Sequence, residues 1–163
     1  MKSAMDIALA VLARRPVTCH EIKKRLQDKK IAAMEITQTI SRLTEWGYLD
    51  DHRLTTEYCQ TRSRCHSRLK IRKYLLLRGV DKVLIDEVLT NFYTQEQEFQ
   101  LCLHLAQQIL ERERQYCERL SRDKADSRVF RNISPYQKAG AKLARLGYPY
   151  EIINKALSSL LNG

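Results

Sequence analysis

Residues 71–92 read IRKYLLLRGVDKVLIDEVLTNF, and this stretch decides the fold class. Its apolar positions are spaced 4, 5, 5, 4 and 3 residues apart: Ile71, Leu75, Val80, Ile85, Leu89 and Phe92. A step of four keeps two side chains on one helix face, and the steps of five interrupt that period before it resumes. The stretch therefore predicts a helical hairpin. Gly79 stands at the end of its first helix, where a residue in the left-handed conformation is favoured.

The same spacing occurs twice more in the chain. An earlier copy, offset by 49 residues, consists of Ile22, Leu26, Ile31, Ile36, Ile40 and Leu43. A later copy, offset by 68 residues, consists of Ala139, Leu143, Tyr148, Ile153, Leu157 and Leu160. Repetition of this kind is typical of helical arrays. Gly147 takes the place of Gly79 in the later copy. Lys30 stands there in the earlier one and predicts a turn that is strained or built differently.

One more helical stretch precedes each hairpin, at 5–12, 54–64 and 99–120. The predicted fold class is all-α, with three tandem three-helix repeats in an elongated array. We place repeat 1 at 1–50, repeat 2 at 51–93 and repeat 3, with a longer first helix and loop, at 94–163. Thr18 with Glu21, and Ser134 with Gln137, are predicted helix caps. The predicted junction between the first two repeats consists of Trp46, Gly47, Tyr48, Leu49, Asp50 and Asp51, with its aromatic rings in the core and its acids capping the next helix.

Composition narrows the class of protein. The chain has 163 residues, of which 44% are hydrophobic and 29% charged, with only 5 glycines and 3 prolines. These values exclude a membrane protein, a collagen and a disulfide scaffold, and argue against a β-sandwich. The 5 cysteines are odd in number and show no C-x-x-C spacing. Because residues 1–15 contain Asp6 and no apolar run with a cleavage site, we expect no signal peptide. We expect a cytoplasmic protein with reduced thiols.

Charge is the main clue to a partner. Lys+Arg 29 against Asp+Glu 19 gives a net charge of +10, which points to a polyanion. No acid occurs between Glu57 and Asp81, and the seven cations of this acid-free stretch are the predicted contacts to a polyanion such as nucleic acid: Arg62, Arg64, Arg68, Lys70, Arg72, Lys73 and Arg78. Secondary predicted contacts are Lys23, Lys24, Arg25, Arg128 and Arg131. The alternative for each is a solvated surface charge.

The sequence contains no catalytic constellation. It has no glycine-rich phosphate loop, no G-x-S-x-G, no H-E-x-x-H and no tetrahedral set of metal ligands. Its histidines stand in unrelated contexts. We therefore predict a protein that is not an enzyme, has no cofactor and holds no metal.

Residues 47–54, which read GYLDDHRL, resemble the junction between repeats in the RecX family. Residues 10–16 (AVLARRP) and 21–26 (EIKKRL) are similar to that family's opening helix and its E-L-x-x-K-L segment. Arg62-Ser63-Arg64, Lys70-Ile71-Arg72 and Arg78-Gly79-Val80 resemble elements of its second repeat. The chain departs from the family at residues 65–69, where CHSRL replaces a glycine-rich turn. The resemblance does not extend to contacts that the family makes through that turn.

The resemblance implies three tandem three-helix repeats and a function. RecX proteins modulate the RecA recombinase negatively: they bind the RecA–DNA filament, hinder its growth or promote its loss, and so lower ATP hydrolysis, strand exchange and coprotease activity in the SOS response. The implied partners are the RecA filament and, weakly, single- and double-stranded DNA. We expect a monomer without membrane contact.

Two other interpretations compete. Residues 17–26, 35–46 and 47–49 resemble the helices and first wing strand of a winged-helix transcriptional regulator that binds DNA. That interpretation needs a strand hairpin after Leu49, whereas residues 50–60 predict a capped helix. A helical scaffold that binds only protein is the second competitor.

Overall fold

The computed structural model describes residues 3–122 and 134–161, and all regular structure within them is α-helical. Its helices divide between two compact units. The N-terminal unit comprises 1–62 and 71–92, and the C-terminal unit comprises 63–70 and 93–163. The all-α class with three-helix repeats is confirmed, while the limits at 50/51 and 93/94 stay predictions. Arg128 and Arg131 lie outside the described residues.

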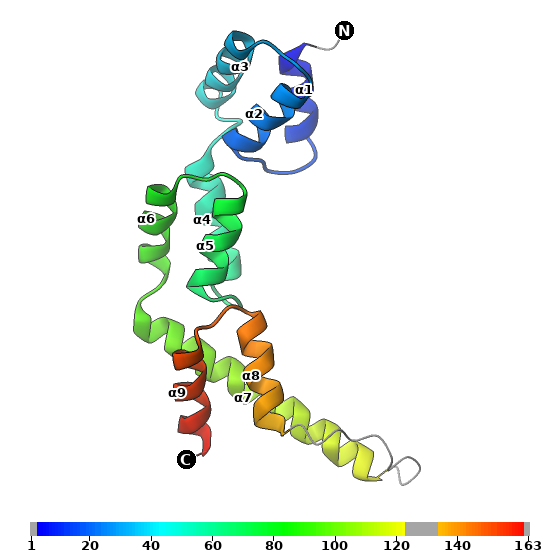
Figure 1. Cartoon of the computed structure of the whole chain (residues 1–163), viewed down its shortest axis with the longest axis vertical. Coiled ribbons are helices and arrows are strands. Elements are labelled where there is room, and N and C mark those ends of the chain that lie inside the picture. Colours follow the sequence, from blue (N-terminus) through cyan, green and yellow to red (C-terminus); the bar gives the residue numbers. More distant parts are fainter. Residues whose placement is uncertain (1–2, 123–133, 162–163) are drawn as a thin grey trace. The chain divides into compact units, whose positions relative to one another are not determined.

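The N-terminal unit begins with a bundle of α1 (Ala4–Leu12), α2 (Cys19–Asp28) and α3 (Ala33–Glu45). It continues with α4 (Asp51–Arg62), most of α5 (Arg68–Leu77) and α6 (Lys82–Phe92). In the C-terminal unit, α8 (Pro135–Arg145) and α9 (Tyr150–Leu161) pack against the long α7 (Gln95–Arg122), as Figure 1 shows. Loop 63–67 and the first turn of α5 also belong to this unit.

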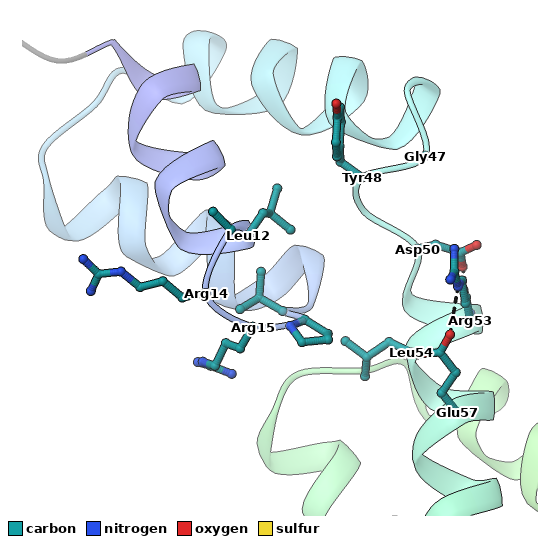
Figure 2. Close-up of a pocket in the computed structure, with 12 residues that line it drawn as sticks. Leu12, Arg14, Arg15, Gly47, Tyr48, Asp50, Arg53, Leu54 and Glu57 are labelled. Atoms are coloured by element: carbon teal, nitrogen blue, oxygen red, sulfur yellow. Dashed lines mark hydrogen bonds and ion pairs between the residues drawn. The ribbon is translucent and has the colours of Figure 1, made fainter.

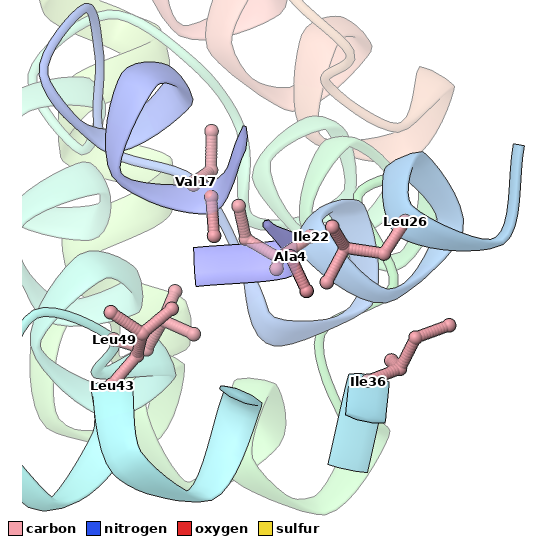
Figure 3. Close-up of a cluster of buried hydrophobic side chains, with 8 residues drawn as sticks. Ala4, Val17, Ile22, Leu26, Ile36, Leu43 and Leu49 are labelled. Carbon is pink, nitrogen blue, oxygen red and sulfur yellow. The ribbon is translucent and has the colours of Figure 1, made fainter. Parts of the chain in front are cut away.

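The apolar spacing found in the sequence is the spacing of the core. Every one of its positions in all three copies is buried or half-buried. Figure 3 shows the first cluster, where Ile22, Leu26, Ile36 and Leu43 meet side chains of α1 and of the following segments. The residues of α1 that are fully buried are Ala4 and Ala8, at 1% exposure each. Small side chains on one helix face bring α1 close to its neighbours.

The turn of each hairpin has the same backbone conformation. Gly79 and Gly147 have φ values of +76° and +88°, and Lys30 has +59°. Lys30 therefore adopts the left-handed conformation in spite of its Cβ, at a cost of ~1 kcal/mol or more. Of the two predicted possibilities for this turn, the strained one is realised.

A repeated hydrogen bond joins the start of one hairpin to the turn of the next. In the N-terminal unit, the buried hydroxyl of Thr18 donates to the carbonyl of Arg78 at 2.7 Å. In the C-terminal unit, the buried hydroxyl of Ser67 donates to the carbonyl of Gly147 at 2.6 Å. The two glycines allow this approach, because a Cβ at Gly79 would lie 2.2 Å from Cγ of His20. We call each of these contacts a repeat joint.

Carboxylates of the next repeat reinforce both joints by capping the same helices. Asp51 Oδ1 accepts from the N–H of Cys19, the first residue of α2, at 2.9 Å. Glu98 Oε1 accepts from the N–H of Arg68, the first residue of α5, at 3.0 Å. A carboxylate is stabilised at a helix N-terminus by free N–H groups and the helix dipole. Asp51 was predicted to cap its own helix, and it caps α2 instead.

The junction at 46–51 corrects one prediction and excludes an alternative. Leu49 is buried at 1% exposure, but Trp46 and Tyr48 are 58% exposed, so the prediction that these rings lie in the core is wrong. They contact each other edge to face, with ring centroids 6.5 Å apart. Asp50 Oδ1 accepts from the N–H of Arg53 at the start of α4. Because α4 follows Leu49 directly, no wing strand can form there, and the winged-helix interpretation is not favoured.

Candidate nucleic-acid interface

In the folded protein, acidic side chains from other helices lie beside the cations of the acid-free stretch 58–80. Arg72 Nε and a second guanidinium nitrogen lie 2.7 and 2.9 Å from the two carboxylate oxygens of Asp86. Arg78 donates to Glu21 at 2.6 Å and to the carbonyl of Pro16 at 2.9 Å, and its side chain is only 12% exposed. The expectation that these two cations are unopposed is therefore wrong. Each is held by an acid from another helix.

The seven predicted cations also divide between the two compact units. Arg62, Arg72, Lys73 and Arg78 belong to the N-terminal unit, whereas Arg64, Arg68 and Lys70 belong to the C-terminal unit. Lys70 Nζ donates to the carbonyl of Arg145 at 2.7 Å, which places it against the end of α8. Lys73 and Arg64 are exposed. Whether any of the seven contacts nucleic acid stays a prediction.

A surface that sequence reasoning missed lies in the N-terminal unit and consists of three adjoining hollows. The first, of about 470 Å³, is lined by apolar residues of α1 and by Arg14, Arg15, Arg25 and Lys29. The second, of about 410 Å³, shares Arg14 and Arg15 with the first and reaches α4. Figure 2 shows the second hollow between the loop that carries Arg14 and Arg15 and the start of α4 with Leu54; both arginine side chains extend away from α4.

The third hollow, of about 340 Å³, shares Arg15 and Leu54 with the second and ends at two aromatic rings. Tyr58 of α4 and Tyr74 of α5 stack with ring centroids 4.5 Å apart and planes 10° from parallel. The guanidinium of Arg62 lies 5.8 Å from the Tyr58 ring centre, and that of Arg78 lies at the same distance from the Tyr74 ring centre. Tyr74 is 41% exposed. We call the three hollows together the arginine–tyrosine track.

The charge along the track is positive at one end and mixed in the middle. The first hollow has no acid in its lining. The second contains Asp50 and Glu57, and Glu57 accepts from Arg53 Nε at 2.9 Å. Glu21, beside the track, lies 3.3 Å from Arg15. The first hollow therefore presents the strongest positive potential of the three.

The ionisation of Glu21 and Tyr58, which are both half-buried, follows from their contacts. Burial raises the pKa of Glu21, but hydrogen bonds from Arg78 and from the N–H of Thr18 outweigh it, and the net shift is downward. Burial, and then the neighbouring phenol of Tyr74, raises the pKa of Tyr58. Glu21 is therefore charged and Tyr58 neutral at pH 7.

Of the predicted secondary contacts, Arg25 is the one that the structure places in the track. Lys23 and Lys24 lie exposed on the same helix but outside the lining residues of these hollows. The signal for the missed site was Arg14-Arg15, next to an expected helix end, together with tyrosines at 58 and 74. These residues meet only because the first joint brings α4 and α5 beside the loop after α1.

The described residues offer no evident reaction centre. Cys65 Sγ lies 3.1 Å from His66 Nδ1 in the loop before α5, and no third ligand joins them to form a group of three among the described His, Cys, Asp and Glu. Across the described ranges, no helix is both long enough and apolar enough to span a membrane.

The fold defines the class first: an all-α protein built of tandem three-helix repeats, with a basic surface beside the first joint. Two family models match, "RecX, first three-helix domain" over residues 4–43 and "RecX, second three-helix domain" over residues 50–89. The chain belongs to the RecX family.

Named relatives and solved structures agree with this assignment. The chain is 29% identical over 150 residues to "Regulatory protein RecX" of Trichlorobacter lovleyi, covering 91% of this chain and 89% of that protein. It is 36% identical over 91 residues to the protein of the same name from Pelodictyon phaeoclathratiforme, covering 55% of this chain and 57% of that protein. A crystal structure of RecX from Lactobacillus salivarius matches with a TM-score of 0.70 at 20% identity, covering 96% and 94% of the two chains.

The match spans less than two thirds of the length of several curated relatives. The matched stretch spans 62% of the Chlorobium phaeobacteroides relative and 55% of the Bacillus velezensis relative.

Proposed function

We propose that this chain regulates the RecA recombinase by binding the filament that RecA forms on DNA. Binding inhibits or destabilises the filament and so lowers its ATP hydrolysis, strand exchange and coprotease activity. Membership of the RecX family carries the proposal, because relatives named "Regulatory protein RecX" match both ends of the chain. The site of action is the cytoplasm, where RecA and DNA are found.

The charge and the repeats support this role. A filament on DNA presents phosphates along a repeating groove, and the chain carries a net charge of +10. Several weak cationic contacts on linked repeats add by raising the effective concentration of each further contact. Binding of this kind needs no reaction centre and depends strongly on salt.

The alternative function, a winged-helix transcriptional regulator, lacks its defining element. Residues 51–62 form α4 where the wing would have to lie. A protein of that class would also recognise a particular duplex sequence, which separates the two functions by experiment.

ATP hydrolysis by RecA on single-stranded DNA tests the proposal. RecA from the same source is titrated with the chain below one molecule per RecA, and we expect inhibition well below equimolar amounts. Doubling the salt concentration should weaken the inhibition steeply. Undiminished hydrolysis at an excess of the chain, together with selective binding to a duplex sequence, would contradict the proposal and restore the winged-helix alternative.

A further inference from the structure

The loop before α5 holds a cysteine and a histidine in contact, and the proposed function uses neither. Cys65 Sγ lies 3.1 Å from Nδ1 of His66, and both side chains are half-buried, so solvent reaches them. A thiol within hydrogen-bond distance of an imidazole is activated as a nucleophile, because the imidazole takes its proton. The pair lies at residues 65–69, where the chain departs from the glycine-rich turn of the RecX family, so it is a feature of this chain.

Contacts on both sides of Cys65 hold this pair in place within the C-terminal unit. The hydroxyl of Tyr93 donates to the carbonyl of His66 at 2.5 Å and lies 3.0 Å from the carbonyl oxygen of Ser63. Two residues after the thiol, the N–H and the hydroxyl of Ser67 donate to carbonyls of the turn between α8 and α9, at 3.1 and 2.6 Å. The loop is therefore fixed before and after the thiol, which preserves the contact between sulfur and imidazole.

A buried hydroxyl lies beside the same loop. Tyr148 is 4% exposed, and its hydroxyl makes no hydrogen bond to any residue of 3–122 or 134–161. Burial raises the pKa of this phenol, and the neighbouring groups of Tyr93, Cys102, Glu98 and Cys65 raise it further. The hydroxyl therefore keeps its proton at pH 7 and lies among the loop and the first turns of α7. Buried donors are nearly always paired in folded proteins, so this one points to an acceptor that joins it in another state of the chain.

From this arrangement we propose that Cys65 is a site of oxidation by hydroperoxides. The sulfur attacks one oxygen of hydrogen peroxide as His66 takes the proton of the thiol. The S–O bond forms, the O–O bond breaks, and the hydroxide that leaves takes the proton from His66 to give water. The sulfur is oxidised by two electrons to a sulfenic acid, and the peroxide is reduced. The hydroxyl of Tyr148 then donates to the new oxygen.

Burial separates three other cysteines from Cys65. Cys59 and Cys102 are both 0% exposed, and desolvation raises the pKa of each thiol to about 11. Desolvation, and then the charge of Asp51, also raises the pKa of Cys19. A thiol that stays protonated at pH 7 is a weak nucleophile.

The test is oxidation of the whole chain by hydrogen peroxide at pH 7, with sulfenic acid trapped by dimedone and located by mass spectrometry. Cys117 is the internal reference, because it is more exposed than Cys65. We expect Cys65 to be labelled about tenfold faster than Cys117, since only a few per cent of an ordinary thiol is ionised at pH 7 and His66 removes that limit. H66N should lower the rate at Cys65 to that of Cys117. H104N, at an exposed histidine of α7, is the matched control and should leave both rates unchanged.

The role of Tyr148 is tested separately with Y148F, which removes only the hydroxyl. The first oxidation of Cys65 should keep its rate in this variant. Without dimedone, however, the sulfenic acid should proceed to sulfinic acid severalfold faster, because no donor holds its oxygen. Y116F, at an exposed tyrosine of α7, should behave as the wild-type chain does. Circular dichroism and thermal unfolding check that each variant is folded.

Three outcomes would overturn the inference. Labelling of Cys65 no faster than that of Cys117 would exclude an activated thiol, and this comparison in the wild-type chain decides even if H66N does not fold. An unchanged rate in folded H66N would exclude the histidine as base. Equal rates of sulfinic acid formation in Y148F and the wild-type chain would exclude the hydroxyl as donor. These measurements need no RecA, so their failure leaves the proposed function untouched.

Discussion

The first repeat joint depends on the absence of a side chain at Gly79, and this dependence predicts the effect of one methyl group. In G79A the new Cβ would lie 2.2 Å from Cγ and 2.5 Å from Cβ of His20. Rotation of the His20 ring moves Cγ away but leaves Cβ in place. The start of α2 must therefore shift away from the turn, which stretches the hydrogen bond from Thr18 to Arg78.

A matched control separates the steric contact from backbone strain. Gly47 has almost the same φ, +72° against +76°, but a Cβ there would meet nothing within 4 Å. Both substitutions carry the left-handed penalty of ~1–2 kcal/mol. Only G79A adds overpacking, at ~1–3 kcal/mol. We therefore expect G79A to destabilise the N-terminal unit by ~1–3 kcal/mol more than G47A does.

Hydrogen exchange of the amides in α2 and α5 is the suitable assay, because it measures opening of each helix rather than of the whole chain. Protection of both helices should fall more in G79A than in G47A. Replacing His20 with glycine in the G79A background should restore part of the protection, since it removes all three close carbons, Cβ, Cγ and Cδ2. Equal losses in G79A and G47A, or no recovery in the double variant, would refute the close-packed joint.

Three further predictions concern a buried hydroxyl, an ion-paired carboxylate and two cysteines. S67A should destabilise the chain by ~1–3 kcal/mol in urea unfolding, because it leaves the half-buried carbonyl of Gly147 without its donor, whereas S134A, at an exposed cap, should cost less than ~1 kcal/mol; equal costs would contradict this. The pKa of Glu21 is lowered on folding, so its stabilising contribution is present above the ordinary value of 4.5 and is lost as pH falls through the lower folded pKa; E21Q should flatten acid unfolding in that range, and an unchanged pH profile would argue against the shift. Cys117 is exposed and should react quickly with a thiol reagent, while buried Cys59, whose pKa is raised to about 11 by desolvation, should react only after unfolding; rapid labelling of Cys59 in the native state would contradict its burial.

The fold could be predicted because burial follows a simple period. Ile71, Leu75 and the equivalent positions repeat at one spacing, and that spacing alone indicates which face of each helix is covered. The turns at Gly79 and Gly147 were also predictable from the sequence, since few other residues adopt positive φ without cost. Lys30 shows that the architecture imposes the turn even where the residue is unfavourable.

The site was less predictable because charge pairing is not local. Arg72 meets Asp86 from 14 residues away, and Arg78 meets Glu21 from 57 residues away. An acid-free stretch of sequence therefore does not define an acid-free surface. Trp46 was misplaced for a related reason: an aromatic ring at a junction is buried only if a neighbouring segment covers it, and the sequence does not say which segments are neighbours.

Co-sedimentation with the RecA filament tests the central claim most directly. RecA is assembled on single-stranded DNA with a non-hydrolysable nucleotide, and the chain is centrifuged with the filament, with RecA alone and with DNA alone. Our account predicts that the chain pellets with the filament in an amount that saturates and that falls as salt rises. A chain that stays in the supernatant with assembled filaments at low salt, or that follows DNA equally well without RecA, would contradict it.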